Sequence, residues 1–592
     1  MNTINNPFST ALSYHRSGNF VEASKLYRFI LSLEPDNLAV LNNLGLISDP
    51  NEKIDFFKRA IGLDPEFADA RFNLAVAFEQ QGRPADALEH YGKIIQIVND
   101  LFSQGNFESA VAKLERLIQL RPDFKSAKLS IASAYINIGA TQQKKGLFKE
   151  AIDSFSKALQ HNPKNHVAHG NIIFTQNFIF GMDTAQQQQE RSRYNDAYAR
   201  QYVDAKYWRT YGVDPRLVKD KLHKLRIGYV SGNFNAYAAT FAFAPLILDF
   251  DHDQFEVVCY ADQTTGDTIT ELFKSKVSLW REISGKDDDE VAQLITADKI
   301  DILVDCAGFQ KGNRLLAFAR KPAPIQVTAW GEPTGTGLSA MDYLMADPVL
   351  IPAEERHLFA ETIIDLPCFL GYWVPEPLPE PSPLPAIASG RVTFGSFNRG
   401  AKHNDALMTL WVKVLNAVPG SVLLMKAPEW DQPEQRASLL DRFARCGGTL
   451  DQISFLGYMS HNDHLASYGC IDICLDPQPH SGGMTTLDAL YMGIPVLTMP
   501  GATPSSRLAS AILSAIGLDD WIATDSEAFV AKAAAFTADL STLGKLRNQL
   551  RFKITESSIG NNTRYARAVE AQYRRMWQNW CGDPNNDVCA RQ

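Results

Sequence analysis

The sequence lacks the features of a membrane-spanning or polyanion-binding protein. No run of about eighteen consecutive apolar residues occurs, so no transmembrane helix is expected. The first residues form neither the basic nor the apolar segment of a secretory signal, which leads us to expect a cytoplasmic protein. The formal net charge of −9 at pH 7 argues against a polyanion as the main partner. We therefore expect no nucleic acid as partner and no membrane insertion.

Cysteine is also scarce, with eight among 592 residues, scattered over the later two thirds of the chain. The closest pair, Cys470 and Cys474, flanks a segment typical of a strand rather than a knuckle of metal ligands. We therefore expect reduced thiols that pack in the interior, and no metal site. The remaining composition, 45% hydrophobic and 21% charged, is typical of globular domains, and the length predicts two to four of them.

Residues 1–170 contain a repeated pattern that predicts paired helices. In each copy a glycine is followed after five residues by alanine, and after four more by an apolar residue. Glycine fits the turn between two helices, and alanine lets them approach closely, with the apolar residue one turn further along the same face. This is the tetratricopeptide pattern, and it predicts an α-solenoid. The copies are Gly18, Ala23 and Tyr27; Gly82, Ala87 and Tyr91; Gly105, Ala110 and Leu114; and Gly146, Ala151 and Phe155.

The predicted array is irregular. Residues 41–65 carry Asp49-Pro50-Asn51 where the glycine turn is expected, and the later glycines are unevenly spaced, so two repeats are predicted to be shortened or fused. A solenoid of this kind presents a concave surface to an extended peptide or a partner domain. The alternative is a rigid spacer or a dimerisation arm, which would make the protein a homo-oligomer. Residues 171–220, with a glutamine-rich run at 186–189, are predicted to form a helical connector.

From residue 221 onward, short apolar segments alternate with helical stretches. This alternation is typical of parallel sheets covered by helices, and it predicts two α/β lobes, residues 221–374 and residues 391–560. A proline-rich linker, residues 375–390, separates them, because its run of alternating prolines at 375–383 fits neither a helix nor a sheet. Residues 561–592 are predicted to be a closing helix and tail. The predicted strands are 225–231, 256–260 and 301–305 in the first lobe, and 421–426 and 453–457 in the second, which opens with a strand and loop over 392–398.

The most informative motif, residues 479–498, follows a predicted strand and opens a predicted helix. Gly482 and Gly483 precede Thr485 and Thr486 at a strand-to-helix junction. Backbone N–H groups and hydroxyls at such a junction face an anion, and the helix dipole adds partial positive charge. We predict a phosphate site at the carboxyl edge of the second sheet. The alternative is a tight turn without a ligand.

This stretch, from Leu475 to Gly501 with Ser506-Arg507 after it, resembles the C-terminal half of the protein O-linked N-acetylglucosamine transferases and their SPINDLY relatives. Residues 320–328 and 335–343 resemble the N-terminal lobe of the same family. The resemblance covers most of the chain and marks it as a divergent member of bacterial type. It implies a tetratricopeptide array followed by two Rossmann-like lobes of the GT-B type.

The resemblance also implies a function. Family members transfer a sugar, most commonly N-acetylglucosamine, from a UDP-sugar to an acceptor hydroxyl, with inversion and without a metal ion. For this chain it implies N-acetylglucosamine or another hexose as the sugar and no further cofactor. The acceptor implied is a protein or peptide held by the repeat array, with a surface glycan or a small molecule as alternatives.

Individual site residues follow from the same resemblance. Lys402 has the spacing of the family lysine that stabilises the charge developing on the leaving diphosphate. Asp488 matches the carboxylate that holds the ribose hydroxyls, and its alternative role is that of an ordinary acid near a helix N-terminus. For Arg507 two roles are expected as alternatives: contact with the phosphates, or an ion pair with an acidic residue. The implied nucleotide-sugar-binding set is Asn398, His461, His464, Gly482, Gly483, Thr485, Thr486, Asp488 and Arg507.

Some positions depart from the family pattern. The family sequence His-Thr-Thr is replaced at its first two positions by Gly483 and Met484, which removes two side-chain donors. His461 stands where lysine is common in the family, while His464 matches a nucleotide-contacting histidine. Without the resemblance, both would be read as surface residues at the start of a helix.

The catalytic base is the largest departure. The family histidine after the first strand is replaced by Tyr237, whose ordinary pKa of about 10 makes it a poor base near neutral pH. Phe309 stands where many relatives have a second histidine. Glu332 is an unusual carboxylate that could substitute as base, or else a solvated loop acid, and a substrate phosphate oxygen would need no side chain. Two hypotheses remain: a transferase with Lys402, Tyr237 and Glu332 as catalytic residues, or an impaired nucleotide-binding scaffold whose repeats bind proteins.

Overall fold

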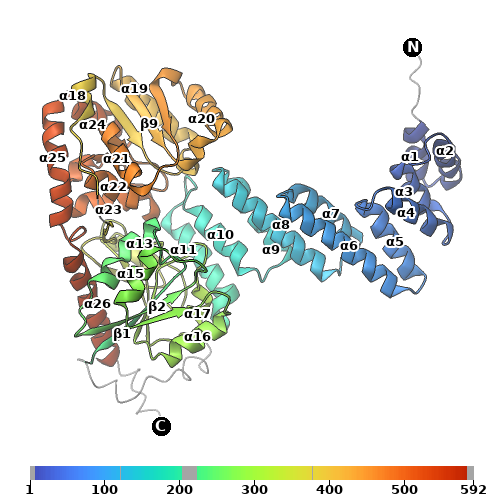
Figure 1. Ribbon diagram of the computed structural model, residues 1–592, viewed down its shortest axis with the longest axis horizontal. Helices are drawn as coiled ribbons and strands as arrows, with labels where there is room; N and C mark the ends of the chain where they lie inside the picture. The colour runs from blue at the N-terminus through green and yellow to red at the C-terminus, as the bar shows by residue number, and fades with distance from the viewer. Residues whose placement is uncertain (1–6, 121, 203–222, 376–377, 583–592) are drawn as a thin grey trace, which may run out of the picture. The chain divides into compact units, whose positions relative to one another are not determined.

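The structure is a computed structural model that describes residues 7–120, 122–202, 223–375 and 378–582 (Figure 1). Parts of the predicted connector, linker and tail, at 203–220, 376–377 and 583–592, lie outside the described residues. The chain divides into two compact units, Met1–Ala140 with Asp153–Asn165, and Thr141–Ile152 with His166–Gln592. No described helix is both long and apolar enough to cross a membrane.

Antiparallel helix pairs form the first unit, as the repeat pattern predicts. Gly18, Gly82 and Gly105 adopt φ angles of 77°, 73° and 72°, the left-handed conformation that favours glycine at a tight turn. Ala23 and Ala87 after them are completely buried, which allows the paired helices to approach closely. The helices of the array are α1 (Pro7–Arg16), α2 (Phe20–Leu33), α3 (Leu38–Ile47), α4 (Glu52–Leu63), α5 (Ala68–Gln80), α6 (Pro84–Ser103), α7 (Phe107–Leu120), α8 (Lys125–Lys144) and α9 (Phe148–His161). The end of α8, the turn after it and the start of α9, Thr141–Ile152, belong to the second unit.

The two predicted irregularities have separate structural causes. Between α3 and α4 the Asp49 carboxylate accepts hydrogen bonds from the N–H groups of Asn51 and Glu52, at 3.0 and 3.1 Å, and so forms the turn without glycine. A regular array would place two helices between the turns at Gly82 and Gly105. The 20-residue helix α6 alone occupies that interval, so the predicted fusion is one continuous helix.

The second unit contains α10 (His166–Gln176) and α11 (Thr184–Tyr194), followed by two parallel sheets. The glutamine-rich run is the first half of α11, whose N-terminus has a capping box formed by Asp183 and Gln186.

The first lobe has seven strands in the order β3-β2-β1-β4-β5-β6-β7, and every pairing is parallel. The sequence predicted three of them; the others are only four residues long. The strands are β1 (Leu225–Ser231), β2 (Phe255–Ala261), β3 (Leu279–Glu282), β4 (Ile302–Asp305), β5 (Ile325–Thr328), β6 (Tyr343–Ala346) and β7 (Thr362–Asp365). Its helices are α13 (Ala238–Phe243), α14 (Pro245–Leu248), α15 (Thr268–Lys276), α16 (Asp288–Ala297) and α17 (Leu315–Ala319).

The second lobe has five parallel strands in the order β10-β9-β8-β11-β12. Its strands are β8 (Thr393–Ser396), β9 (Val422–Lys426), β10 (Ile453–Leu456), β11 (Ile473–Leu475) and β12 (Val496–Leu497). Its helices are α18 (Pro385–Ser389), α19 (Asp405–Ala417), α20 (Pro433–Arg445), α21 (His461–Ser467), α22 (Met484–Tyr491), α23 (Leu508–Ala515), α24 (Ser526–Ala538) and α25 (Leu540–Glu556).

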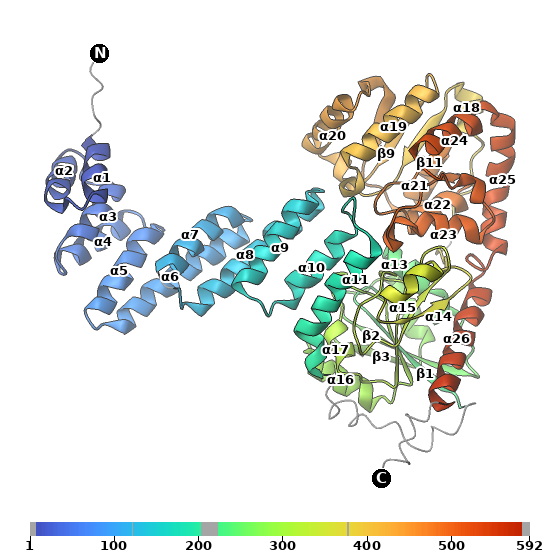
Figure 2. The ribbon, with the colours of Figure 1, turned by 180° about the vertical axis from the view of Figure 1, so that it is seen from behind.

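The last described helix, α26 (Asn562–Gly582), returns to the first lobe, and both views show it beside that lobe (Figure 2). The hydroxyls of Tyr573 and Tyr229 lie 3.2 Å apart, and Trp330 Nε1 donates to the Tyr565 hydroxyl at 2.8 Å. The predicted face of the closing helix is therefore buried against the first lobe. Two parallel α/β lobes tied by a C-terminal helix, after a tetratricopeptide solenoid, form the expected GT-B architecture.

Candidate functional site

Two loops of the second lobe meet at the carboxyl edge of its sheet. Strands β8 and β11 are neighbours, so the loops that follow them adjoin. Lys402 Nζ, from the first loop, donates to the Ser481 carbonyl oxygen at 2.9 Å and to Asn398 Oδ1 at 3.3 Å. Thr485 Oγ1 donates to the same Asn398 oxygen at 3.2 Å. Three residues that the sequence placed in the site are thus connected directly.

The Lys402 ammonium is buried, with 9% of the residue exposed. Burial lowers the pKa of Lys402 from its ordinary value; the Arg399 charge acts in the same direction, and the Asp476 carboxylate opposes both. Burial likewise raises the pKa of Asp476. A bound anion would stabilise the charged form of Lys402, so the site favours a negatively charged ligand.

Asp476 organises the loop that leads into α22. Its Oδ2 accepts from the hydroxyls of Ser481 and Thr498, both at 2.7 Å, and its Oδ1 accepts from the Gly482 N–H at 2.7 Å. Ser481 Oγ in turn accepts from the Ala509 N–H at 3.0 Å. Neither Asp476 nor Ser481 was among the predicted site residues. The available signal was an aspartate directly after a buried strand and before a proline.

The N-terminus of α22 has the form of an anion site. Its N-cap, Gly483, supplies no side-chain cap, and within the described residues the N–H groups of Met484 and Thr485 have no acceptor. A Cβ added at Gly482 would lie 2.7 Å from Thr486 Oγ1 and 2.8 Å from Thr485 Oγ1, so this position requires glycine. Free N–H groups at a helix start bind phosphate well.

The predicted threonines have different environments. Thr485 is partly exposed and its hydroxyl points to Asn398, next to the open helix end. Thr486 is buried, and its hydroxyl donates to the Gly482 carbonyl at 2.9 Å. Thr486 therefore stabilises the turn at Gly482, whereas Thr485 lies beside the open end of the helix.

Asp488 lies one turn further along α22. The Tyr372 hydroxyl donates to Asp488 Oδ1 at 2.8 Å, and His464 Nε2 lies 3.8 Å from its Oδ2. Burial and the Asp488 charge hold the pKa of Tyr372 well above its ordinary value, so Tyr372 stays a neutral donor. His464 Nδ1 is buried without a hydrogen-bond partner in the described part of the chain. The His461 ring packs against Phe241 of the first lobe at 5.6 Å.

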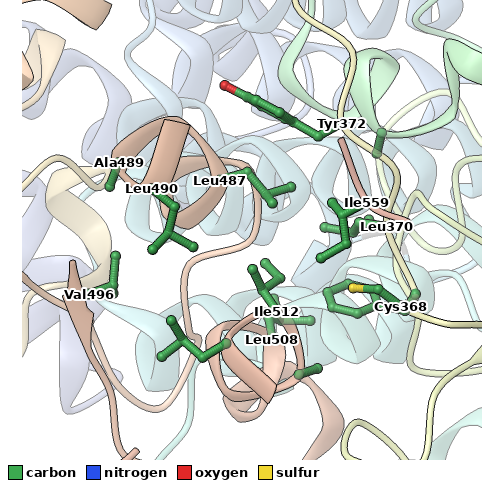
Figure 3. Close-up of a cluster of buried hydrophobic side chains, with 14 of the residues drawn as sticks. Cys368, Leu370, Tyr372, Leu487, Ala489, Leu490, Val496, Leu508, Ile512 and Ile559 are labelled. Atoms are coloured by element: carbon green, nitrogen blue, oxygen red, sulfur yellow. The ribbon is translucent and has the colours of Figure 1, made fainter. Parts of the chain in front are cut away.

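Buried hydrophobic side chains hold α22 in position (Figure 3). Leu487, Ala489 and Leu490 on the helix lie in a buried cluster with residues of the strand that follows, of α23 and of the crossing segment that carries Tyr372. The sequence contains no local signal for Tyr372, because it lies 116 residues from Asp488. The other labelled members of the cluster are Cys368, Leu370, Val496, Leu508, Ile512 and Ile559.

Arg507 pairs with an acid instead of facing the phosphate loop. Its guanidinium contacts Glu355 at 2.5 and 3.0 Å and donates to the Leu350 carbonyl at 3.2 Å. Both partners belong to the first lobe. Of the two roles considered for Arg507, the geometry corresponds to the ion pair, which here ties the lobes together.

Glu332 is not the solvated loop acid that the sequence offered as one alternative. It is buried, with 7% exposed, because helix α11 covers its loop. Its Oε1 accepts from Asn177, from Arg191 at 3.4 Å and from Thr334 at 3.1 Å, and its Oε2 accepts from the Phe309 N–H at 3.1 Å. Both carboxylate oxygens are engaged, which leaves Glu332 poorly placed to take a proton from an acceptor.

Tyr237 has the opposite environment. It lies at the start of α13 with 42% exposed, and its hydroxyl has no hydrogen-bond partner among the residues that the structure describes. The same helix reaches the second lobe through Phe241 and His461. The Tyr237 side chain is therefore accessible from solvent.

Comparisons with known proteins agree with this architecture. The profile of glycosyl transferase family 41 matches residues 206–372 and 384–569. Tetratricopeptide profiles match residues 56–98 and 132–165.

Similar proteins include SPINDLY of Oryza sativa subsp. japonica, named a probable UDP-N-acetylglucosamine–peptide N-acetylglucosaminyltransferase. It is 33% identical over 440 residues, which are 73% of this chain and 46% of that protein. The corresponding transferase of Caenorhabditis elegans is 24% identical, over 60% of this chain and 41% of that protein. The chain thus spans less than half the length of these curated relatives. The solved structure of an O-GlcNAc transferase variant of Thermobaculum terrenum superposes with a TM-score of 0.70 at 28% identity, covering 98% of this chain and 99% of that one.

Proposed function

The chain belongs to glycosyl transferase family 41, and we propose that it transfers a sugar from a UDP-sugar to a hydroxyl group of a protein acceptor, with inversion at the anomeric carbon. One observation carries the proposal: the buried Lys402 ammonium and the open N-terminus of α22 converge on one loop. N-acetylglucosamine is the first sugar to test, because the names of the relatives specify it.

The geometry supports a specific role for each site residue in this reaction. As the bond between the anomeric carbon and the diphosphate breaks, negative charge grows on the β-phosphate. Lys402 and the N–H groups of Met484 and Thr485 supply fixed positive partners there, and our proposal needs no resident metal ion. Asp488, oriented by Tyr372, binds the ribose hydroxyls.

The acceptor side of the proposal leaves Glu332 out, because both of its oxygens are already engaged. Tyr237 contacts the acceptor and orients its hydroxyl. A phosphate oxygen of the donor takes the acceptor proton, since a neutral tyrosine is a poor base near pH 7.

A second candidate is a scaffold that binds a nucleotide but does not catalyse. The observation that favours it is the replacement of both family histidines by Tyr237 and Phe309. In this case the repeats would carry the function through protein–protein contacts.

Calorimetric titration with UDP, GDP and UDP-sugars tests the proposal, with Lys402→Ala beside the matched control Lys413→Ala. Lys413 lies on the exposed face of α19. We expect UDP to bind, the control to bind alike, and Lys402→Ala to weaken binding about 10- to 100-fold, as for the loss of a charged hydrogen bond. Slow hydrolysis of the bound UDP-sugar supports the transferase, and binding without any hydrolysis or transfer supports the scaffold. Absence of UDP and UDP-sugar binding would refute the assignment.

A further inference from the structure

A cavity of about 210 Å³ lies in the second unit beside Lys402, which forms part of its wall. It is enclosed by the turn between α8 and α9, by the end of α10 and by the loops after β8 and β9. The turn is closely packed against the first of these loops, because a Cβ added at Gly146 would lie 3.1 Å from the Ala401 carbonyl oxygen. The cavity is therefore bounded by backbone as well as by side chains.

One wall of the cavity is aromatic. The rings of Phe148 and Phe178 are stacked with centroids 4.7 Å apart, and Phe174 lies 5.5 Å from Phe178. On its other side Phe178 stacks on His480 at 4.6 Å. The row of rings thus runs from the cavity to the loop that carries Ser481 and Gly482. Such a wall provides a flat apolar surface for a side chain of a ligand.

The lining of the cavity also contains charged residues. Lys144 and Arg399 are exposed, and neither has an ion-pair partner among the described residues. Glu429 Oε1 accepts from the Gly400 N–H at 3.3 Å, whereas its Oε2 is buried without a hydrogen-bond donor in the described part of the chain. A buried carboxylate oxygen without a partner is costly, so a ligand N–H at this position would stabilise the complex.

We propose that this cavity is a subsite for the acceptor, and that it selects a peptide carrying an apolar side chain next to an acidic one near the modified hydroxyl. The inference rests on the proposed transferase function and names its substrate class. The apolar side chain packs against Phe148 and Phe178, and a backbone N–H of the peptide donates to Glu429. The acidic side chain lies between Lys144 and Arg399, which gives charge complementarity. A neutral glycan could stack on the rings but would leave both cations without partners.

Peptide binding measured by fluorescence anisotropy tests this subsite without requiring turnover. The probes are fluorescein-labelled peptides of about twelve residues with one serine, identical except for Leu-Glu, Leu-Gln or Leu-Lys beside it, each titrated with and without saturating UDP. The protein is the full chain as wild type, Lys144→Glu and Lys145→Glu. Lys145 is also exposed but is not among the residues that line the cavity, so it controls for the change in net charge. Thermal unfolding verifies that all three are folded.

We expect the wild type and Lys145→Glu to bind the Leu-Glu peptide about fivefold more tightly than the Leu-Gln peptide. In Lys144→Glu this preference should vanish or reverse toward Leu-Lys. Equal binding of all three peptides by the wild type, or equal effects of the two substitutions, would overturn the subsite. It would also be overturned if neutral oligosaccharides bound more tightly than any of the peptides and Phe148→Ala weakened them. The affinity of the wild type for UDP is measured separately. If the wild type did not bind UDP, the proposed function would be refuted, whereas the peptide preference is judged from the anisotropy data alone.

Discussion

The ammonium group of Lys402 donates to the carbonyl oxygen of Ser481 at 2.9 Å and thereby joins the loops that follow β8 and β11. This contact orients a buried cation toward the loop whose glycines precede α22. Lys402 therefore links the electrostatics of the site to the backbone that would cradle the diphosphate. The predictions below follow from this link and from the contacts around it.

UDP affinity is expected to fall as the pH rises above neutral. Burial lowers the pKa of Lys402 in the free protein, so its ammonium loses its proton below the ordinary lysine value of about 10.4. The diphosphate binds the charged form, so the binding energy is retained below the lowered pKa and is lost above it. Calorimetric titration from pH 6.5 to pH 9.5 measures this effect. Lys402→Arg, charged throughout that range, should give a flatter profile; parallel profiles for the two proteins would contradict the prediction.

Asp476→Asn is expected to lower the free energy of unfolding by about 2–4 kcal/mol and to weaken UDP binding. The carboxylate accepts three hydrogen bonds inside the protein, and an amide cannot accept all of them without leaving buried donors unpaired. Urea denaturation gives the stability change. The exposed Asp441→Asn is the control and should change stability by less than about 0.5 kcal/mol. If Asp476→Asn left both the free energy of unfolding and the UDP affinity unchanged, this carboxylate would not organise the site.

Tyr372→Phe is expected to weaken binding of uridine and UDP by a similar factor, about 5- to 20-fold. The substitution removes only the hydroxyl that donates to Asp488, so it disturbs the proposed ribose contact and leaves the diphosphate contacts in place. Lys402→Ala should behave differently, weakening UDP far more than uridine. Competition titrations with the two ligands distinguish the patterns. If Tyr372→Phe affected UDP alone, Asp488 would not be the ribose ligand.

Arg507→Ala is expected to destabilise the protein by about 2–4 kcal/mol while changing UDP affinity less than threefold. The side chain pairs with Glu355 across the lobes and is largely buried, so its removal leaves a carboxylate without its partner. Thermal or urea unfolding, together with UDP titration, measures both quantities. A double-mutant cycle with Glu355→Gln should show coupling between the two positions. Loss of UDP binding without loss of stability would instead place Arg507 at the phosphates.

The sequence by itself determined the features that depend on short-range patterns. The turns at Gly18, Gly82 and Gly105, the two alternating lobes and the small-residue junction before α22 were all predicted, because helix and strand periodicities and turn residues act over a few positions. The family departures at Tyr237 and Glu332 were also visible in the sequence, although the catalytic role of Tyr237 stays a prediction.

Only the tertiary structure decided which distant groups meet. Arg507 finds Glu355 across 152 positions, and Glu332 is buried because Arg191, 141 positions away, covers it. Tyr372, in the segment after β7, donates to Asp488 in the second lobe. The short strands of the first lobe form only because neighbouring strands supply their hydrogen bonds. Local propensity contains no information about such pairings, since long-range packing places charges and hydroxyls together without regard to their distance in sequence.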